Sequence, residues 1–210
     1  MKNSFIISLA MAWTTLTACA KAIDVTIEGT HYDYVEEVYL IVNEDTAHAQ
    51  LVPLKDGHFK TTIRVNRNDF IRISRSKDLD KETRNVVIAD SKSITVNLYM
   101  GTVEGSEQSK QLNDCLLEIE RSGPGTFHID YFGDDPAVWE KIRADEQATR
   151  KRMEMHQQEI IRQKIIDNAD NLIPAWLVRT QQDIPAEILN KATKGKPKWM
   201  KHPILTGKKK

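Results

Sequence analysis

An alternation of apolar and polar residues from Ile23 to Tyr99 constrains this chain more than any other feature. Successive side chains of a β-strand point to opposite faces, so a period of two predicts strands that bury one face. Asp56 and Gly57 separate two of the runs, because such residues adopt the backbone angles of a tight turn. About seven strands at intervals of roughly ten residues predict an antiparallel β-sandwich or open barrel. The apolar runs are 23–27, 35–42, 50–54, 59–65, 70–73, 86–88 and 94–98.

After Gly105 the apolar spacing changes from that of a strand to that of a helix. Ser106 is a suitable N-cap, and the residues that follow predict a short amphipathic helix against the sheet. We expect the thiol of Cys115 to be buried on its apolar stripe. The stripe consists of Leu112, Cys115, Leu116 and Ile119.

Asp135 followed by Pro136 predicts the start of a long helix, since aspartate caps a helix and proline suits its first position. We expect this helix to reach about Asn168, solvated over its polar first half and packed over its second half. Pro174 and Pro185 predict the starts of two further short helices.

These patterns predict an α+β fold, in which an N-terminal antiparallel β-sandwich or open barrel precedes a helical segment with one long helix. We divide the chain into a signal peptide at 1–18, a β-sandwich domain with its closing helix at 19–121, a linker at 122–135, a helical region at 136–193 and a basic C-terminal tail at 194–210.

The first 18 residues resemble a bacterial lipoprotein signal. Lys2 precedes an apolar run, Phe5–Trp13, which is too short to span a bilayer. A branched apolar residue and two small residues then precede Cys19, so we expect cleavage before this cysteine and its acylation. The alternative is an ordinary signal cut after Ala20 or Ala22, which would leave a soluble periplasmic protein.

Charge and cysteine content narrow the function classes. The 30 basic and 30 acidic residues balance, which argues against nucleic acid as a partner. Only two cysteines, Cys19 and Cys115, occur, which excludes a disulfide scaffold, a CxxC redox centre and a cysteine zinc cluster. No acidic run follows Cys19, so we expect a lipid anchor in the outer membrane and a protein that faces the periplasm.

Six short segments occur in an order that resembles the N-terminal domain of unknown function found before the thioredoxin-like module in envelope thiol:disulfide interchange lipoproteins of Gram-negative bacteria. They are Val25–Gly29, Val38–Leu40, Asp56–Phe59, Ser93–Val96, Val103–Ser106 and Asn168–Ala175. The resemblance implies a β domain that presents a surface to a partner. The sequence contains no CxxC pair, so we do not expect the redox activity of those proteins.

Catalytic signals are weak. Ser74 and Lys77 match S-x-x-K but lie in a charged loop, and Gly101–Ser106 reads as a strand-to-helix cap rather than a phosphate loop. The six histidines show no helical i, i+4 pair, and adjacent carboxylates are explained by capping. We therefore expect no catalytic residue, no metal and no cofactor. An enzyme or redox accessory, with an assembled site or a reactive Cys115, is the alternative.

Two surfaces are candidates for contact. Trp139, Trp176 and Trp199 either line an interaction surface or serve as core anchors at helix starts. Lys208, Lys209 and Lys210 end a lysine-rich segment that is either a solvated, partly disordered tail or a contact for anionic lipid. The expected partners are the membrane, through the N-terminal lipid, and an unknown envelope protein or small ligand.

Overall fold

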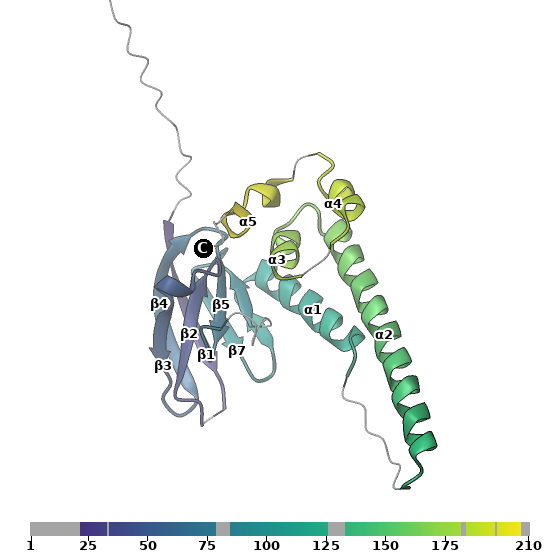
Figure 1. Ribbon diagram of the computed structural model, residues 1–210. Helices are drawn as coiled ribbons and strands as arrows, with labels where there is room; N and C mark the ends of the chain where they lie inside the picture. Colours follow the sequence, from purple (N-terminus) through teal and green to yellow (C-terminus); the bar gives the residue numbers. More distant parts are fainter. Residues whose placement is uncertain are drawn as a thin grey trace, which may run out of the picture.

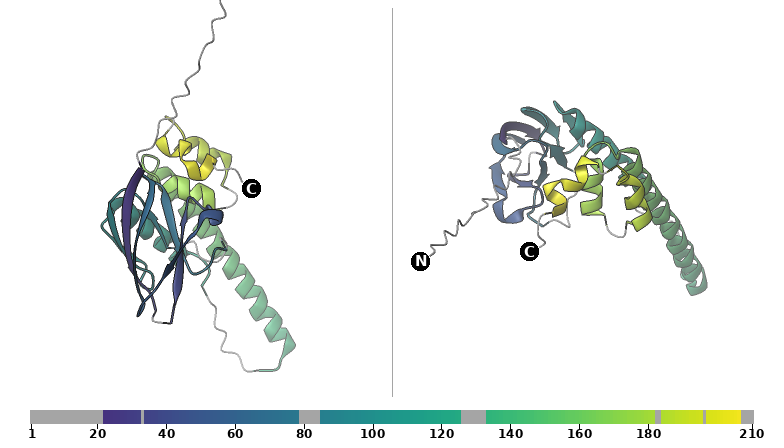
Figure 2. Two further views of the ribbon diagram at one scale, coloured as in Figure 1. Left: turned by 90° about the vertical axis from the view of Figure 1, so that its left-hand side faces the viewer. Right: turned by 90° about the horizontal axis from the view of Figure 1, so that it is seen from above.

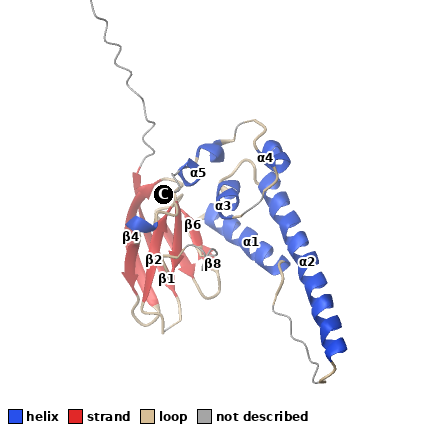
Figure 3. Ribbon diagram, viewed as in Figure 1, coloured by secondary structure: helices blue, strands red, loops and turns tan. Residues whose placement is uncertain are grey.

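The fold is a β-sandwich with a helical layer on one side, as Figures 1 and 3 show. This arrangement confirms the predicted α+β class with an N-terminal β region and one long helix in the C-terminal part. The computed structural model describes residues 22–32, 34–78, 85–125, 133–181, 184–195 and 197–206.

Two four-stranded sheets form the sandwich. The first sheet has the order β4-β1-β7-β8, with β1 at Ala22–Thr30, β4 at His58–Asn66, β7 at Ser93–Asn97 and β8 at Thr102–Glu104. The second has the order β3-β2-β5-β6, with β2 at Glu37–Val42, β3 at Gln50–Pro53, β5 at Phe70–Ser74 and β6 at Val86–Ile88. All neighbouring strands are antiparallel except β1 and β7, which run parallel.

The alternating apolar residues of both sheets meet between the layers. Val25 and Ile94 of the first sheet and Leu40 of the second are fully buried there. The outer face of the first sheet is polar, and cross-strand partners face each other in register. Lys60 pairs with Glu28 at 3.0 Å on this exposed face. The period of two therefore separates core from solvent, as the alternation predicts.

Gly29 is required by its cross-strand neighbour. It lies opposite Phe59 in the β1–β4 register. A Cβ atom at this position would lie 2.2 Å from Cε1 of Phe59 and 2.8 Å from Cγ2 of Val96. The phenyl ring thus occupies the space that a side chain at position 29 would need, and only glycine leaves it free.

The helices follow the β region. They are α1 at Glu107–Ser122, α2 at Pro136–Asp167, α3 at Ile173–Thr180, α4 at Ala186–Ala192 and α5 at Pro203–Thr206, with 3-10 turns η1 at Thr46–His48 and η2 at Lys198–Lys201. Both predicted caps are confirmed: the Ser106 hydroxyl accepts from the backbone N–H of Ser109, and the Asp135 carboxylate from that of Ala137. The buried residues of α2 are Ile161 and Ile165, both in its second half, so its first half projects from the body (Figure 2).

A second core joins the helices to the outer face of the second sheet. It contains Phe70 of β5, Ile88 of β6 and Leu112 of α1, together with residues of α2 and α3. The helix α1 also covers the edge of β6 and the turn between β7 and β8. The Ser109 hydroxyl bonds both backbone groups of Ile88, and the Asn113 amide donates to the carbonyl of Gly101 at 2.5 Å. These contacts satisfy edge groups that would otherwise be open to another strand.

The C-terminal segment differs from the prediction. We expected residues 194–210 to form a solvated tail, but Trp199, His202 and Ile204 are buried in the structure. These side chains recur among exposed lysines, so one side of the segment packs while the charges stay in water. Residues 207–210 lie outside the described residues.

No helix in the described part of the chain is long and apolar enough to cross a membrane. The expected signal peptide at 1–18 and Cys19 lie outside that part.

Candidate functional site

Exposed aromatic side chains gather at one end of the sandwich. We call Tyr32, Tyr34, Tyr99 and Met100 the tyrosine patch. Tyr32 and Tyr34 belong to the β1–β2 connection, and the other two residues to the turn between β7 and β8. Because β1 and β7 are parallel, with Thr30 opposite Asn97, the two connections emerge at the same end. The topology thus unites residues that are far apart in sequence.

The rings of the tyrosine patch contact one another. Tyr32 is central: its ring centroid lies 5.1 Å from that of Tyr34, with nearly parallel planes, and 4.4 Å from that of Tyr99. The imidazole of His31 lies 5.5 Å from the Tyr32 ring on a tilted plane. Mutual contact fixes the ring orientations before any partner arrives, which lowers the entropy cost of binding.

The patch is also exposed. Tyr34 is 72% exposed, Met100 63%, Tyr99 54% and Tyr32 39%. Single exposed apolar residues are common on proteins, but a group of large side chains in contact is a feature of interaction sites. Tyrosine suits such sites because it offers a rigid apolar face and a hydroxyl at low conformational cost.

Backbone hydrogen bonds hold both connections. The Asn97 side chain accepts from the N–H groups of Tyr99 at 3.1 Å and Met100 at 2.8 Å. On the other connection, the N–H of His31 donates to the carbonyl of Gly57 at 2.8 Å, and Nδ1 of His31 accepts from the N–H of Tyr32. The patch therefore rests on a braced end of the sandwich rather than on free loops.

The electrostatics of the patch favour binding over acid–base chemistry. Desolvation and the neighbouring hydroxyl of Tyr99 raise the pKa of Tyr32. The phenol therefore keeps its proton at neutral pH, where it can both donate and accept hydrogen bonds. A group that does not change charge near neutrality is a poor general base.

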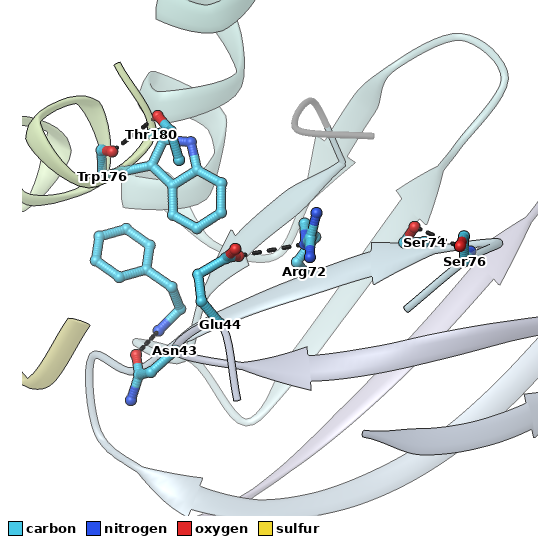
Figure 4. A network of polar contacts seen from close by, with 8 residues as sticks. Asn43, Glu44, Arg72, Ser74, Ser76, Trp176 and Thr180 are labelled. Atoms are coloured by element: carbon cyan, nitrogen blue, oxygen red, sulfur yellow. Dashed lines mark hydrogen bonds and ion pairs between the residues drawn. The ribbon is translucent and has the colours of Figure 1, made fainter. Parts of the chain in front are cut away.

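A buried ion pair forms the second notable polar feature. Nε of Arg72 on β5 lies 3.2 Å from Oε1 of Glu44, and the two side chains are 1% and 7% exposed. Figure 4 shows the Glu44 carboxylate directed at Arg72, with the Trp176 indole of α3 above it. Burial raises the pKa of Glu44, while Arg72 and Arg179 of α3 oppose that shift. The pair thus joins the turn after β2 to β5, and Arg179 adds a charge from the helical layer.

The backbone at this pair is in an uncommon conformation. Asn43 and Glu44 have φ angles of 47° and 66°, a region that asparagine tolerates and glutamate rarely adopts. The Asn43 side chain donates to Asp69 at 2.8 Å and accepts from the N–H of Phe70 at 3.0 Å. These bonds hold the turn that directs Glu44 inward. We interpret the network as a structural connection between layers, because it lies inside the packed interface.

The predicted tryptophan surface needs correction. Trp176 and Trp199 are 1% and 3% exposed and belong to the helical core, so they do not offer a contact surface. Trp139, at the start of α2, is half-buried, and its indole N–H donates to the carbonyl of Gly133 at 2.8 Å. The interpretation of the tryptophans as core anchors is therefore correct for Trp176 and Trp199.

Cys115 is a buried free thiol, which confirms its predicted place on the α1 stripe. Burial raises its pKa to about 11, so the reactive thiolate is scarce at neutral pH.

The two residues of the S-x-x-K candidate contact different groups. The Ser74 hydroxyl accepts a hydrogen bond from the N–H of Ser76, whereas Nζ of Lys77 lies 5.3 Å from the centre of the Tyr39 ring. Neither Cys115 nor the pair of Ser74 and Lys77 thus resembles an activated nucleophile.

The other candidate positions fall partly within and partly outside the described residues. The Gly101–Ser106 segment ends in the predicted cap of α1, and it also contains β8, a strand that the sequence did not predict. Among the described residues, histidine, cysteine and carboxylate side chains form no group of three that could hold a metal ion. Cys19 and the lysines at positions 208–210 lie outside the described residues.

The tyrosine patch was not predicted from the sequence. Two tyrosines close together between the predicted strands at 23–27 and 35–42 were an available signal. Tyr99 offered no such signal, because only the parallel pairing of β1 with β7 places it beside Tyr32.

Comparison with protein-family models, with curated proteins and with solved structures gives no match for this chain.

Proposed function

We propose that this protein is an exported, lipid-anchored and non-catalytic binding module of the Gram-negative cell envelope. The tyrosine patch is the observation that carries the binding role, since it combines exposure, mutual ring contact and a braced position at the sandwich end. The lipoprotein-like signal before Cys19 supports the anchor. The partner is an envelope protein or a small ligand, and the protein faces the periplasm from the outer membrane.

This proposal extends the resemblance to the N-terminal domain of thiol:disulfide interchange lipoproteins. In that reading the β domain binds while a separate module supplies redox chemistry. The enzyme alternative draws no support from Cys115, whose burial and raised pKa disfavour reaction. An ordinary signal cleavage would change the proposal from an anchored module to a soluble periplasmic one, with the same contact surface.

Site-specific photocrosslinking in the native host tests the binding role. The photoreactive residue p-benzoylphenylalanine replaces Tyr34 in one variant and Thr95 in the control, since Thr95 is exposed on the polar outer face of the first sheet. We expect an ultraviolet-dependent adduct from position 34 that Tyr99→Ser weakens, and none from position 95. The same products at both positions, or no adduct at position 34 in cells that contain the protein, would contradict the proposal.

A further inference from the structure

Charge is divided along this chain at Glu187. All 30 acidic residues lie at or before it, whereas eight of the 30 basic residues, all lysines, lie after it. Residues 1–187 therefore carry 22 basic and 30 acidic side chains, and residues 188–210 carry eight lysines and no acid. Although the net charge is zero, residues 1–187 are acidic and residues 188–210 are basic. A protein with such a charge distribution is oriented by an electric field.

The fold fixes the part of this segment that carries Lys198 and Lys201 at a defined end of the sandwich. Nε2 of His202 lies 2.9 Å from the carbonyl oxygen of Asn68, in the turn between β4 and β5. Asn66 pairs with Ala22, the first residue of β1. Figures 1 and 2 show α5 beside the end of the sandwich at which β1 begins. Lys198, Lys201 and the first strand of the described domain therefore lie at one end.

The same end must lie close to the lipid if Cys19 is acylated. Only two residues, Ala20 and Lys21, separate Cys19 from Ala22. An extended chain advances at most about 3.6 Å per residue, so the acylated cysteine stays within roughly 11 Å of β1. The tyrosine patch follows the other end of β1 and therefore faces away from the membrane.

The side chains exposed at this end suit a membrane surface. Lys198 and Lys201 of η2 are exposed and form no ion pair with a described carboxylate, and Met200 between them is 40% exposed. Arg67 and Lys92 are exposed on neighbouring turns and line a shallow hollow next to Ala22. Acids also lie at this end, and each is paired or shielded: Asp24 is paired with Arg64 at 3.2 Å and Asp45 with His48 at 2.8 Å, while Asp69 is buried and Asp90 half-buried.

We infer that this end of the sandwich is a membrane-contact face whose lysines bind anionic phospholipid head groups. The inference rests on the proposed lipid anchor for its geometry. Each lysine near an anionic surface contributes about 1 kcal/mol. The acidic body is repelled by the same surface, so the field selects the orientation that places the basic end on the bilayer. His202 is a positioning residue, because it holds the lysines beside the anchor.

Vesicle binding of the non-lipidated protein tests the charge contact. The protein begins at Cys19 and carries Cys115→Ala, and the vesicles contain phosphatidylcholine alone or mixed with phosphatidylglycerol. One variant changes three exposed lysines at this end to glutamine, and the matched control changes three exposed lysines elsewhere. The test positions are Lys92, Lys198 and Lys201, and the control positions are Lys55, Lys77 and Lys141.

We expect the intact protein to prefer the anionic vesicles. The three substitutions at this end should weaken that binding about tenfold or more, and the control substitutions by about twofold at most. Salt above about 0.15 M should also weaken it. Equal losses in both variants, or no preference for anionic vesicles, would overturn the inference.

Orientation is a second, independent readout. Cys19 is coupled to a maleimide lipid, which replaces natural acylation and separates this test from the question of whether the cell lipidates the protein. A dye on an unnatural amino acid replaces Ser91, at the basic end, or Tyr99, in the tyrosine patch. Nitroxide lipids should quench the dye at position 91 more strongly, and His202→Ala should reduce the difference. Equal quenching at both positions would overturn the assigned face.

Discussion

His202 joins the C-terminal segment to the sandwich through a hydrogen bond to the carbonyl oxygen of Asn68, 134 residues earlier in the chain. Its second ring nitrogen, Nδ1, accepts from the backbone N–H of Ile204 at 3.2 Å. Nε2 must therefore carry the proton, and the imidazole is neutral with both nitrogens engaged. The ring also meets Phe70 edge-on, with centroids 4.8 Å apart. One neutral side chain thus connects the basic end to the β region.

Acid should weaken this connection. Burial lowers the pKa of His202, although the Asn68 carbonyl and Asp69 act in the opposite direction. Unfolded histidine has a pKa of about 6.5, so the unfolded chain binds the proton first and stability falls as the pH drops below that value. Urea unfolding at pH 8 and pH 5.5 should show a smaller loss for His202→Gln than for the unaltered protein. Equal losses of stability in the two proteins would contradict this role of His202. Glu44, whose pKa is raised, is present in both proteins, so its contribution cancels in the comparison.

Cys115 should behave as a core residue. Its pKa near 11 predicts slow reaction with a thiol reagent in the folded protein and fast reaction in denaturant. Cys115→Ser places a hydroxyl among apolar groups and should lower the free energy of unfolding by about 1–3 kcal/mol. Cys115→Ala serves as a comparison that adds no polar group. Rapid labelling of the folded protein would revive the redox alternative.

The Glu44–Arg72 pair should be costly to break. Glu44→Gln keeps the side-chain shape but removes the Glu44 carboxylate charge from beside the buried guanidinium of Arg72, so we expect a loss of about 3 kcal/mol in the free energy of unfolding. The matched control is Glu28→Gln, which removes an exposed ion pair with Lys60 and should cost at most about 1 kcal/mol. Chemical denaturation of both variants measures the difference. Equal losses in the free energy of unfolding would show that the buried pair stabilises the fold no more than the exposed pair does.

Gly29→Ala should destabilise the sandwich, since the added methyl group would meet the Phe59 ring. Overpacking of this kind costs about 1–3 kcal/mol. Phe59→Leu should recover part of the loss in the Gly29→Ala background, because the smaller side chain vacates the space. Gly125→Ala is the control, since no atom lies within 4 Å of its added Cβ. Independent, additive effects of the two core substitutions would contradict the proposed contact.

Lipidation at Cys19 predicts a difference in mass and partition. The full chain and Cys19→Ala are expressed in a Gram-negative host and separated by detergent phase partition. We expect the unaltered protein in the detergent phase with an intact mass that includes acyl chains, and the variant in the aqueous phase. The reason is that acyl chains bury apolar surface in the bilayer. Two aqueous proteins without added acyl mass would remove the lipid anchor from the proposal.

The sequence alone was sufficient for the local structure. Alternation marked the strands, and the caps at Ser106 and Asp135 marked two helix starts, because these signals depend on neighbours within a few residues. Cys115 was placed correctly, since its helical stripe is also a local pattern. The short strand β8 was not predicted, because it has three residues and pairs only along one edge.

Only the tertiary structure decided which distant segments meet. The parallel pairing of β1 with β7 places Tyr99 against Tyr32, and no local pattern encodes that pairing. The C-terminal segment read as a solvated lysine tail, because its charges dominate the sequence while its buried residues are few and widely spaced. Its position depends on the carbonyl of Asn68, which His202 reaches only in the folded chain. Local preferences thus defined the elements, whereas long-range packing brought together the tyrosine patch and fixed the basic end.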